Sequence, residues 1–226
     1  MLKRAIGILP PRDFTFLPTF FSLAEQRVLL TTALRKLDAM ESIQSRRRRK
    51  ALLHVGHLPT LRPTTSNPMQ DCFLPEDCYE FEEGHYDGVI KHFREMHLTS
   101  WPSEVTELSP VLKRLHSLFP GPEDIQTHLL HLASNGEIHP HVDNLSASGS
   151  WILGVSLGAE RLMHLEPGDE NGDSYQVLLP SGSVYIQRDS LRYHYKHSIG
   201  PAVNWEEGQR VSIMIRVRHH SSKLAS

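Results

Sequence analysis

The chain has 226 residues, a length that suits one sizeable domain with a full core. Hydrophobic residues make up 39% and charged residues 22%, a globular composition that excludes wholesale disorder, collagen and coiled coil. A formal charge of −2 argues against a uniformly basic nucleic-acid binder. With only two cysteines, a disulfide scaffold is excluded, and no apolar run has the roughly 18 residues that a membrane helix needs.

The amino terminus is basic, because Lys3, Arg4 and Arg12 all precede the first acidic residue, Asp13. Its apolar run is too short for the core of a secretory signal, whereas a mitochondrial presequence is basic, amphipathic and poor in acids. These residues therefore allow two interpretations, a short mitochondrial presequence or an untargeted tail.

Residues 14–55 are predicted to form a strand and a helix that support the rest of the fold. The segment begins with aromatic, β-prone residues, and Ser22 with Glu25 then forms a capping box, which begins many helices. Apolar residues recur at helical spacing after it, which predicts a helix from Leu23 to at least Leu37.

Residues 56–83 are predicted to be a proline-rich loop or insertion. Prolines break any regular element there, at Pro59, Pro63, Pro68 and Pro75. The basic run Arg46–Lys50 precedes this segment, and we interpret it as a solvated helix end that faces the acidic residues between 76 and 83. A nuclear signal or an RNA contact is the alternative interpretation of the basic run.

The remaining chain is predicted to be a helix at about 102–118 followed by β structure. Turn residues separate short candidate strands, which favours a sandwich or jelly roll. The candidate strands are Thr127–Ala133, Ile138–Val142, Ser150–Leu157, Arg161–Glu166, Tyr175–Leu179, Ser183–Gln187, Tyr193–Lys196 and Gln209–Arg218. The predicted fold class is α+β: one domain over residues 1–226, with a jelly-roll core over 84–218 and amino-terminal helices that back one sheet.

The first clue to chemistry is the sequence His139-Pro140-His141-Val142-Asp143. Residues two apart on a strand point to the same face, so His141 and Asp143 project together. A second histidine from a distant strand would complete the two-histidine, one-carboxylate triad that is typical of non-haem Fe(II) oxygenases. His139 has the same parity and is an alternative ligand.

The distant histidine is expected in the stretch Arg192–Ile199. His197 closes the triad if the chain has crossed the sandwich by then, but His194 is its rival, and strand parity alone does not choose between them. If neither histidine binds metal, this stretch is a polar edge strand.

The last predicted strand carries apolar and basic residues on opposite faces. Val211, Ile213, Ile215 and Val217 share one face, and Arg210, Ser212, Met214 and Arg216 share the other. A buried guanidinium needs an anionic partner, and arginine grips carboxylates bidentately, so Arg210 and Arg216 are suited to bracket a dicarboxylate. The alternative is that this face is simply exposed to solvent.

The order of these motifs, H-x-D, then a distant histidine, then R-x5-R, resembles the AlkB-like Fe(II)/2-oxoglutarate dioxygenase family and its double-stranded β-helix core. The resemblance extends to residues 154–158, to residues 180–185 and to the pattern that ends at Ile199, and it is greatest for the mitochondrial type within the family. That type favours the mitochondrion as compartment, with the cytoplasm or nucleus as the alternative.

The resemblance implies a site and its cofactors. Fe(II) would be bound by His141, Asp143 and His197. The cosubstrate 2-oxoglutarate would be bound by Arg210 at its distal carboxylate and by the Tyr185 hydroxyl, with Arg216 nearer the metal. The third reactant would be O2.

The resemblance also implies a dioxygenase that couples decarboxylation of 2-oxoglutarate to hydroxylation. We expect a protein substrate, because Leu130-His131-Leu132 stands where nucleic-acid repair members carry Asn-x-Tyr, and no clear nucleotide-recognition lid is seen. The first alternative is an oxidative demethylase of methylated RNA or DNA bases. The second is a jelly-roll metal-binding or interaction protein without turnover, and the oligomeric state stays open.

Overall fold

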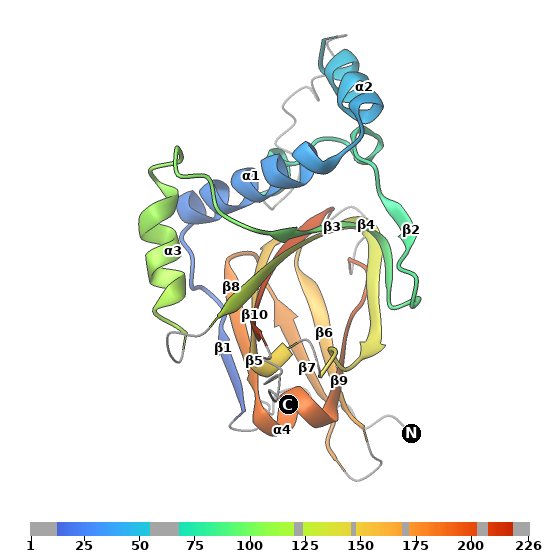
Figure 1. The fold of residues 1–226 in the computed structure, drawn as a ribbon. Coiled ribbons are helices and arrows are strands. Elements are labelled where there is room, and N and C mark those ends of the chain that lie inside the picture. The colour runs from blue at the N-terminus through green and yellow to red at the C-terminus, as the bar shows by residue number, and fades with distance from the viewer. Residues whose placement is uncertain are drawn as a thin grey trace, which may run out of the picture.

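Two curled β-layers and a cap of helices make up the protein (Figure 1). The structure, a computed structural model, describes residues 13–54, 68–119, 124–145, 148–168, 172–202 and 208–218. The helices are α1 (Leu23–Met40), α2 (Ile43–His54), α3 (Leu108–His116) and α4 (Asp189–His194), with 3-10 turns η1 (Gln70–Cys72) and η2 (Glu76–Cys78). The strands are β1 (Phe14–Leu17), β2 (Glu82–Gly84), β3 (Ile90–Leu98), β4 (Ile125–His141), β5 (Ser148–Gly158), β6 (Arg161–Pro167), β7 (Tyr175–Leu179), β8 (Ser183–Arg188), β9 (Tyr195–Ile199) and β10 (Arg210–Arg218).

The strands pair antiparallel in the order β1-β8-β5-β10-β4-β9-β6-β7, and β3 adds to β4 and β2 to β3. The long strand β4 passes from one layer to the other, because its first part pairs with β10 and its last residues pair with β9. The path therefore folds over itself as a jelly roll, and apolar side chains of both layers meet inside it. The predicted α+β class and jelly-roll core are confirmed.

A bulge in β4 explains why the sequence predicts two strands where the structure has one. Pairing with β3 passes from Glu137 directly to Leu132, so the residues between them are extra. A Cβ at Gly136 would lie 2.6 Å from the carbonyl oxygen of His92, so the bulge needs glycine there. The buried guanidinium of Arg161 donates hydrogen bonds to carbonyls of the bulge and holds it in place.

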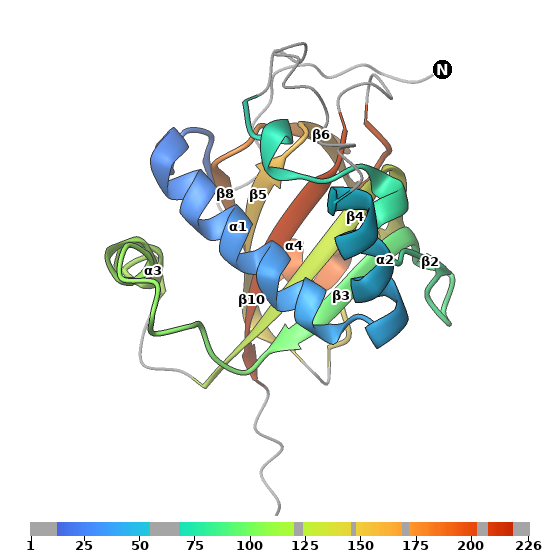
Figure 2. The ribbon, with the colours of Figure 1, turned by 90° about the horizontal axis from the view of Figure 1, so that it is seen from above.

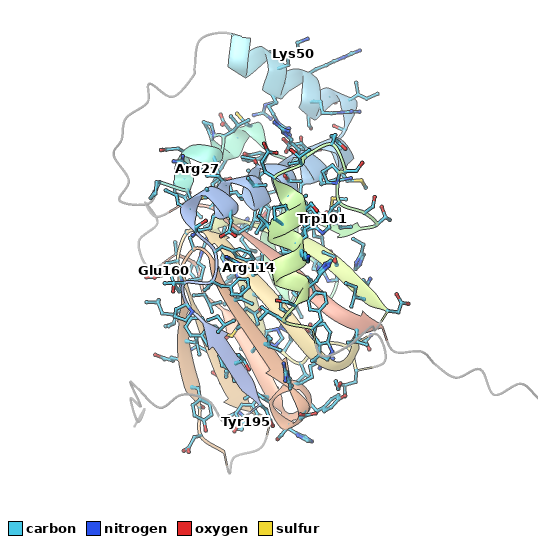
Figure 3. The ribbon with its side chains drawn as sticks, turned by 90° about the vertical axis from the view of Figure 1, so that its left-hand side faces the viewer. Arg27, Lys50, Trp101, Arg114, Glu160 and Tyr195 are labelled. Carbon is cyan, nitrogen blue, oxygen red and sulfur yellow. The ribbon has the colours of Figure 1, made fainter. Side chains whose placement is uncertain are left out.

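The helix α1 lies across the outer face of the larger layer, over β10, β4 and β3 (Figure 2). Its predicted capping box is present: the Ser22 hydroxyl accepts from the Glu25 N–H, and the Glu25 carboxylate accepts from the Ser22 N–H at 2.8 Å. Beside it, Arg114 of α3 pairs with Glu25 at 3.0 Å (Figure 3). The amino-terminal helices therefore back one sheet, as predicted.

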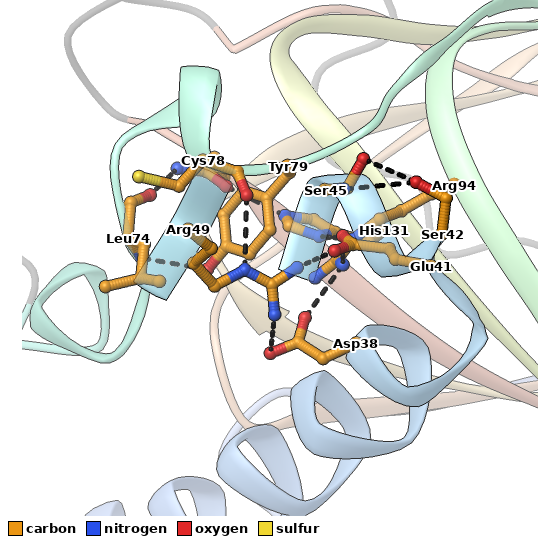
Figure 4. Close-up of polar contacts among 11 residues, drawn as sticks. Asp38, Glu41, Ser42, Ser45, Arg49, Leu74, Cys78, Tyr79, Arg94 and His131 are labelled. Carbon is orange, nitrogen blue, oxygen red and sulfur yellow. Dashed lines mark hydrogen bonds and ion pairs between the residues drawn. The ribbon is translucent and has the colours of Figure 1, made fainter. Parts of the chain in front are cut away.

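A buried polar network fastens α1 and α2 to the sheet (Figure 4). Asp38 and Glu41 at the end of α1 each pair with two guanidinium groups, those of Arg49 in α2 and Arg94 in β3. The interpretation of the basic run as a solvated helix end is thus wrong at Arg49, which is buried. Its acidic partners come from the preceding helix, 8 and 11 residues before it (49 − 41 and 49 − 38), and not from residues 76–83.

His131 of β4 extends this network to the start of β10. Arg94 Nε donates to His131 Nδ1 at 2.9 Å, so His131 Nε2 carries the proton and donates to Gln209 Oε1, also at 2.9 Å. Burial, helped by the charge of Arg94, holds the pKa of His131 well below its ordinary value, so the ring is neutral. Aromatic rings surround it, those of Phe73, Tyr79 and Phe81.

The segment predicted as a proline-rich loop is only partly described, because residues 55–67 lie outside the described residues. From residue 68 to residue 81 the chain is an ordered loop with two short 3-10 turns. This part forms η1 and η2 and packs against the sheet, with Met69, Phe73 and Cys78 buried. The prolines set turns between these short elements instead of preventing order.

Two further elements differ from the predictions. The helix expected at 102–118 begins only at Leu108, after turns. The strand expected at Tyr193–Lys196 is displaced, since α4 occupies the chain up to His194 and β9 follows it.

Among the described residues, no helix combines the length and the apolar character that crossing a membrane requires.

Candidate functional site

Three side chains that the sequence singles out converge at the open side of the jelly roll. His141 ends β4, Asp143 follows it in the next loop, and His197 lies opposite His141 in the register of β4 and β9. His141 Nε2 lies 3.5 Å from Asp143 Oδ1, and the potential ligand atoms of all three residues lie within 4.8 Å of one another. No other group of histidine, cysteine and acidic residues in the described part of the chain meets this spacing.

Hydrogen bonds and burial prepare these groups as ligands. His141 Nδ1 donates to the His139 carbonyl at 2.9 Å, which leaves Nε2 to face Asp143. Burial lowers the pKa of His197 to about 4, so this ring is neutral at physiological pH. Burial alone would raise the pKa of Asp143, but the hydrogen bond from His141 and the neighbouring side chains of His197 and Arg216 hold it well below its ordinary value.

The donor set therefore consists of two imidazole nitrogens and one carboxylate. Burial lowers the pKa of His141, but its hydrogen bond to Asp143 raises it more, to above its ordinary value, and a bound metal ion would displace that shared proton. The second carboxylate oxygen, Asp143 Oδ2, is buried and has no hydrogen-bond partner among the described residues. A buried, unpartnered anionic oxygen beside two imidazole nitrogens fits a divalent metal ion. His139 and His194, the alternative ligands, lie outside this group: His139 is 40% exposed and bonds to Glu137, and His194 is exposed at the end of α4.

Arg210 lies at the other end of the same interior face, at the start of β10. It is fully buried, and burial lowers its pKa to about 10. Its Nε donates to Ser156 Oγ at 3.0 Å, but Nη1 and Nη2 have no hydrogen-bond partner among the described residues. Two buried guanidinium nitrogens that point to the same interior are suited to a carboxylate, which accepts from both at once. The alternative that this face of β10 is exposed to solvent is wrong.

Tyr185 and Arg216 lie between these two ends. Tyr185 of β8 is 4% exposed and crosses Gly154 of β5, where a Cβ would lie 2.3 Å from the ring. Arg216 Nη2 lies 3.3 Å from Asp143 Oδ1, so Arg216 is at the metal end, as expected. A cavity extends from the metal end to Tyr185 and is lined by aliphatic and polar side chains: Ile90, His128, Leu130, Ile138, His141, Tyr185, His197, Ile199, Ser212, Met214 and Arg216.

Sequence reasoning missed several residues that shape this site. Arg192 of α4 donates to the carbonyls of Asp143 and Asn144 at 3.2 and 3.4 Å and so holds the loop that carries Asp143. Gly154 and Ser156 support Tyr185 and Arg210. Gly154 and Ser156 are two residues apart on one strand, so the sequence shows that they share a face. Arg192 bonds only to backbone carbonyls, and no pattern of residue types in the sequence indicates such a contact.

Comparison with known proteins agrees with this geometry. The family model of the 2OG-Fe(II) oxygenase superfamily matches residues 13–216. The chain is 34% identical over 161 residues to "Alpha-ketoglutarate-dependent dioxygenase alkB homolog 7, mitochondrial" of Bos taurus, a match covering 70% of this chain and 71% of that protein. The protein of the same name from Mus musculus is 32% identical over the same shares of both chains.

A shorter match and one solved structure complete the comparison. Over 78 residues, 33% of this chain and 12% of the other, the chain is 40% identical to "tRNA (carboxymethyluridine(34)-5-O)-methyltransferase alkbh8" of Xenopus tropicalis. The solved structure of OsALKBH1 superposes with a TM-score of 0.54 at 17% identity, over 94% of this chain and 99% of that one. At that identity the likeness concerns the fold, and it agrees with the jelly roll described above.

Proposed function

This chain belongs to the 2OG-Fe(II) oxygenase superfamily and is of its AlkB type, and from that premise we propose that it hydroxylates a protein side chain at the site described above. Enzymes of this superfamily use Fe(II), 2-oxoglutarate and O2. The observation that carries the proposal is one shared interior face with a three-ligand metal site at one end and the unpartnered guanidinium of Arg210 at the other. A metal site alone would not require a buried arginine.

In the proposed mechanism, His141, Asp143 and His197 would hold Fe(II), and 2-oxoglutarate and O2 would bind beside these residues. The iron would supply the oxidation that converts 2-oxoglutarate and O2 to succinate and CO2, with one oxygen atom entering succinate and the other a substrate C–H bond. Arg210 pairs with the distal carboxylate of 2-oxoglutarate, and Tyr185 donates its hydroxyl hydrogen to the cosubstrate. The aliphatic walls exclude water from the reacting atoms.

Aliphatic walls also support a protein substrate. Methylated bases are bound by stacking on aromatic rings. Of the described residues that line this cavity, Tyr185 is the only one with an aromatic ring other than histidine, and it is buried against Gly154 at the proposed cosubstrate end; the others are aliphatic chains, histidines, Ser212, Met214 and Arg216. A slender side chain suits such walls better than a flipped base does.

Demethylation of an RNA base is the second candidate function. The observation that favours it is the exposed basic face of α2, where Arg46, Arg47, Arg48 and Lys50 remain open to solvent while Arg49 anchors the helix. Such a face is suited to phosphates. Figure 1 places α2 on the side of the molecule opposite α4, so this face would act as a remote contact and not as part of the cavity.

Absorbance spectroscopy of the iron–cosubstrate chelate tests the enzyme class and the ligands. Wild type should show a visible charge-transfer band when Fe(II) and 2-oxoglutarate are mixed without air, and release succinate once air is admitted. His197→Ala should lose both, because one of its three ligands is gone, whereas His194→Ala should retain both.

Each result of this experiment has a distinct meaning. A band that persists in His197→Ala would show that the ligand set is wrong. The absence of a band in wild-type protein that binds iron would favour the non-catalytic metal-binding alternative. With the band established, stimulation of succinate release by peptides or by methylated oligonucleotides decides between the two substrate classes.

We also propose a mitochondrial location, with the cytoplasm or nucleus as the alternative. The basic amino terminus supports it, and two relatives carry the word mitochondrial in their names. The residues concerned, 1–12, lie outside the described residues. Microscopy of the full chain with a carboxyl-terminal fluorescent tag should show mitochondrial signal that is lost when Lys3, Arg4 and Arg12 are changed to Gln.

A further inference from the structure

A second polar cluster lies beside the metal triad and has no part in the mechanism above. Glu95 of β3 binds His128 of β4, with 3.0 Å between His128 Nε2 and Glu95 Oε2. His85, in the turn between β2 and β3, places its Nε2 3.8 Å from the other oxygen of Glu95. His97 stacks on the His128 ring, with 4.8 Å between the ring centroids.

Strand register places this cluster at the metal end of the cavity. His128 is opposite Met214 of β10, and both side chains line the cavity together with His141 and His197. Along β10, Met214 is two residues from Arg216, which contacts Asp143, and four from Arg210. A group held by His128 would therefore lie near the metal and away from the proposed carboxylate subsite.

The hydrogen-bonding chemistry of the pair leaves one atom for a ligand. A carboxylate only accepts hydrogen bonds, so His128 Nε2 carries the hydrogen that it shares with Glu95. The residue is only 8% exposed, and its other ring nitrogen, Nδ1, is buried. That nitrogen has no hydrogen-bond partner in the described part of the chain. An unpartnered buried nitrogen costs free energy that a bound donor would recover.

The carboxylate itself stays ionised. Burial raises the pKa of Glu95, but the hydrogen bond from His128 and the proximity of His85 and His97 lower it more, to below its ordinary value. The cavity thus offers an acceptor nitrogen backed by a negative charge, flanked by the aliphatic side chains of Ile90 and Leu130.

We propose that the Glu95–His128 pair positions the substrate by accepting a hydrogen bond from the amino group of a lysine or N-methyl-lysine side chain, whose aliphatic stem packs on Ile90, Leu130 and Met214. This inference rests on the proposed function and narrows its substrate class. The apolar walls match four methylene groups, and the ionised carboxylate matches a cationic nitrogen. A leucine side chain would satisfy the walls but leave His128 Nδ1 without a donor.

The chain offers a matched control pair. Glu137 and His139 of β4 form the same contact, with 2.9 Å between Glu137 Oε1 and His139 Nε2. His139 is 40% exposed and is not among the residues that line the cavity. Removing the Glu137 charge therefore tests whether the location of the pair matters, and not merely its chemistry.

The test measures succinate release by the iron-loaded enzyme with 2-oxoglutarate and degenerate peptide pools whose central residue is lysine, ε-monomethyl-lysine or leucine. Lysine or methyl-lysine pools should stimulate wild type well above the rate without peptide, and leucine pools should not. Glu95→Gln and His128→Leu should reduce the stimulated kcat/KM roughly 10- to 100-fold, as expected for a lost charged hydrogen bond. Glu137→Gln should match wild type, and all three variants should keep the iron–2-oxoglutarate band.

Several outcomes would overturn the inference. Equal stimulation by leucine pools, no stimulation by any pool, or full stimulation of Glu95→Gln would each show that the pair does not select an amino group. Loss of the band in Glu95→Gln or His128→Leu would show a role in the metal site instead of substrate positioning. The absence of a band in wild type would refute the proposed function itself, so the two failures are distinguishable.

Discussion

Replacing Arg210 with methionine should separate folding from cosubstrate binding. Burial lowers the pKa of Arg210 from its ordinary value to about 10. Because a pKa difference of one corresponds to about 1.4 kcal/mol, burial disfavours the charged group by about 3 kcal/mol. The substitution also removes the hydrogen bond to Ser156, worth about 1 kcal/mol. We therefore expect Arg210→Met to be about 2 kcal/mol more stable than wild type in the absence of 2-oxoglutarate.

The same substitution should abolish the response to the cosubstrate. A ligand that binds only the folded state stabilises it in proportion to the logarithm of its concentration over its dissociation constant. Loss of a buried, charge-assisted pair costs about 3 to 5 kcal/mol, or more than 100-fold in affinity. Urea denaturation with Mn(II), with and without 2-oxoglutarate, should show a stabilising shift for wild type and none for Arg210→Met.

Arg161 provides the matched control, because it is also fully buried but has both terminal guanidinium nitrogens, Nη1 and Nη2, occupied. Its guanidinium donates to the carbonyls of Ala133, Gly136, Gly200 and Gly208. Arg161→Met should lower the free energy of unfolding by about 3 kcal/mol or more, since those carbonyls lose their partner. If Arg210→Met proves equally destabilising, Arg210 is a structural residue. If it still responds to 2-oxoglutarate, the distal carboxylate binds elsewhere.

Two further predictions concern the support of the site. Gly154→Ala should weaken 2-oxoglutarate binding by roughly 10-fold or more, measured by titration of the iron chelate band, because the new Cβ would lie 2.3 Å from the Tyr185 ring. Gly84→Ala is the control and should leave binding unchanged, because the atom nearest to its Cβ would lie 3.7 Å away. His131 is neutral when folded and has its ordinary pKa of 6.5 when unfolded, so the unfolded state binds more protons below pH 6.5 and stability is lost as pH falls. Between pH 7.5 and 5.5 this contribution is about 1.4 kcal/mol, and urea denaturation should show that His131→Gln removes it from the pH dependence.

The interior face of β10 could be predicted from sequence because the strand is paired on both sides. A central strand buries both faces, so its alternating pattern of aliphatic and polar residues survives intact, and Arg210 and Arg216 fall on the face that the alternation assigns to them. The H-x-D pair could be found because its two ligands lie two residues apart in a single stretch of chain, even though β4 ends at His141 and Asp143 lies in the loop after it.

The strand β3 could not be recognised, and its contacts explain why. Arg94 points to the outer face and joins the network under α1, whereas Glu95 points to the inner face and binds His128. Because both faces carry paired polar groups, the alternation that marks a half-buried strand is absent. The partners that make these groups buriable lie far away in sequence, so no local pattern reveals them.

Strand parity alone could not choose between His194 and His197 for a different reason, which lies in the backbone. Parity arguments assume one continuous strand, but the chain turns at Asp189, where φ is +44°, and forms α4 up to His194 before β9 begins. The helical turn changes the side-chain period from two to 3.6, so the direction of each histidine depends on where the turn ends.

The position of each reactive group follows from a single register. Along β10, the cross-strand partners begin with Leu132 beside Arg210, reach His128 beside Met214, and end near Arg216 at the metal. A slip of one residue would turn every one of these side chains to the helix-covered face. Pairing with β4 on one side and β5 on the other prevents such a slip, and Gly154, the partner of Met214 in β5, leaves room for Tyr185. The order of Arg210, Met214 and Arg216 along β10 is thus fixed by backbone pairing, which is why substitutions at the two ends of this face should act independently.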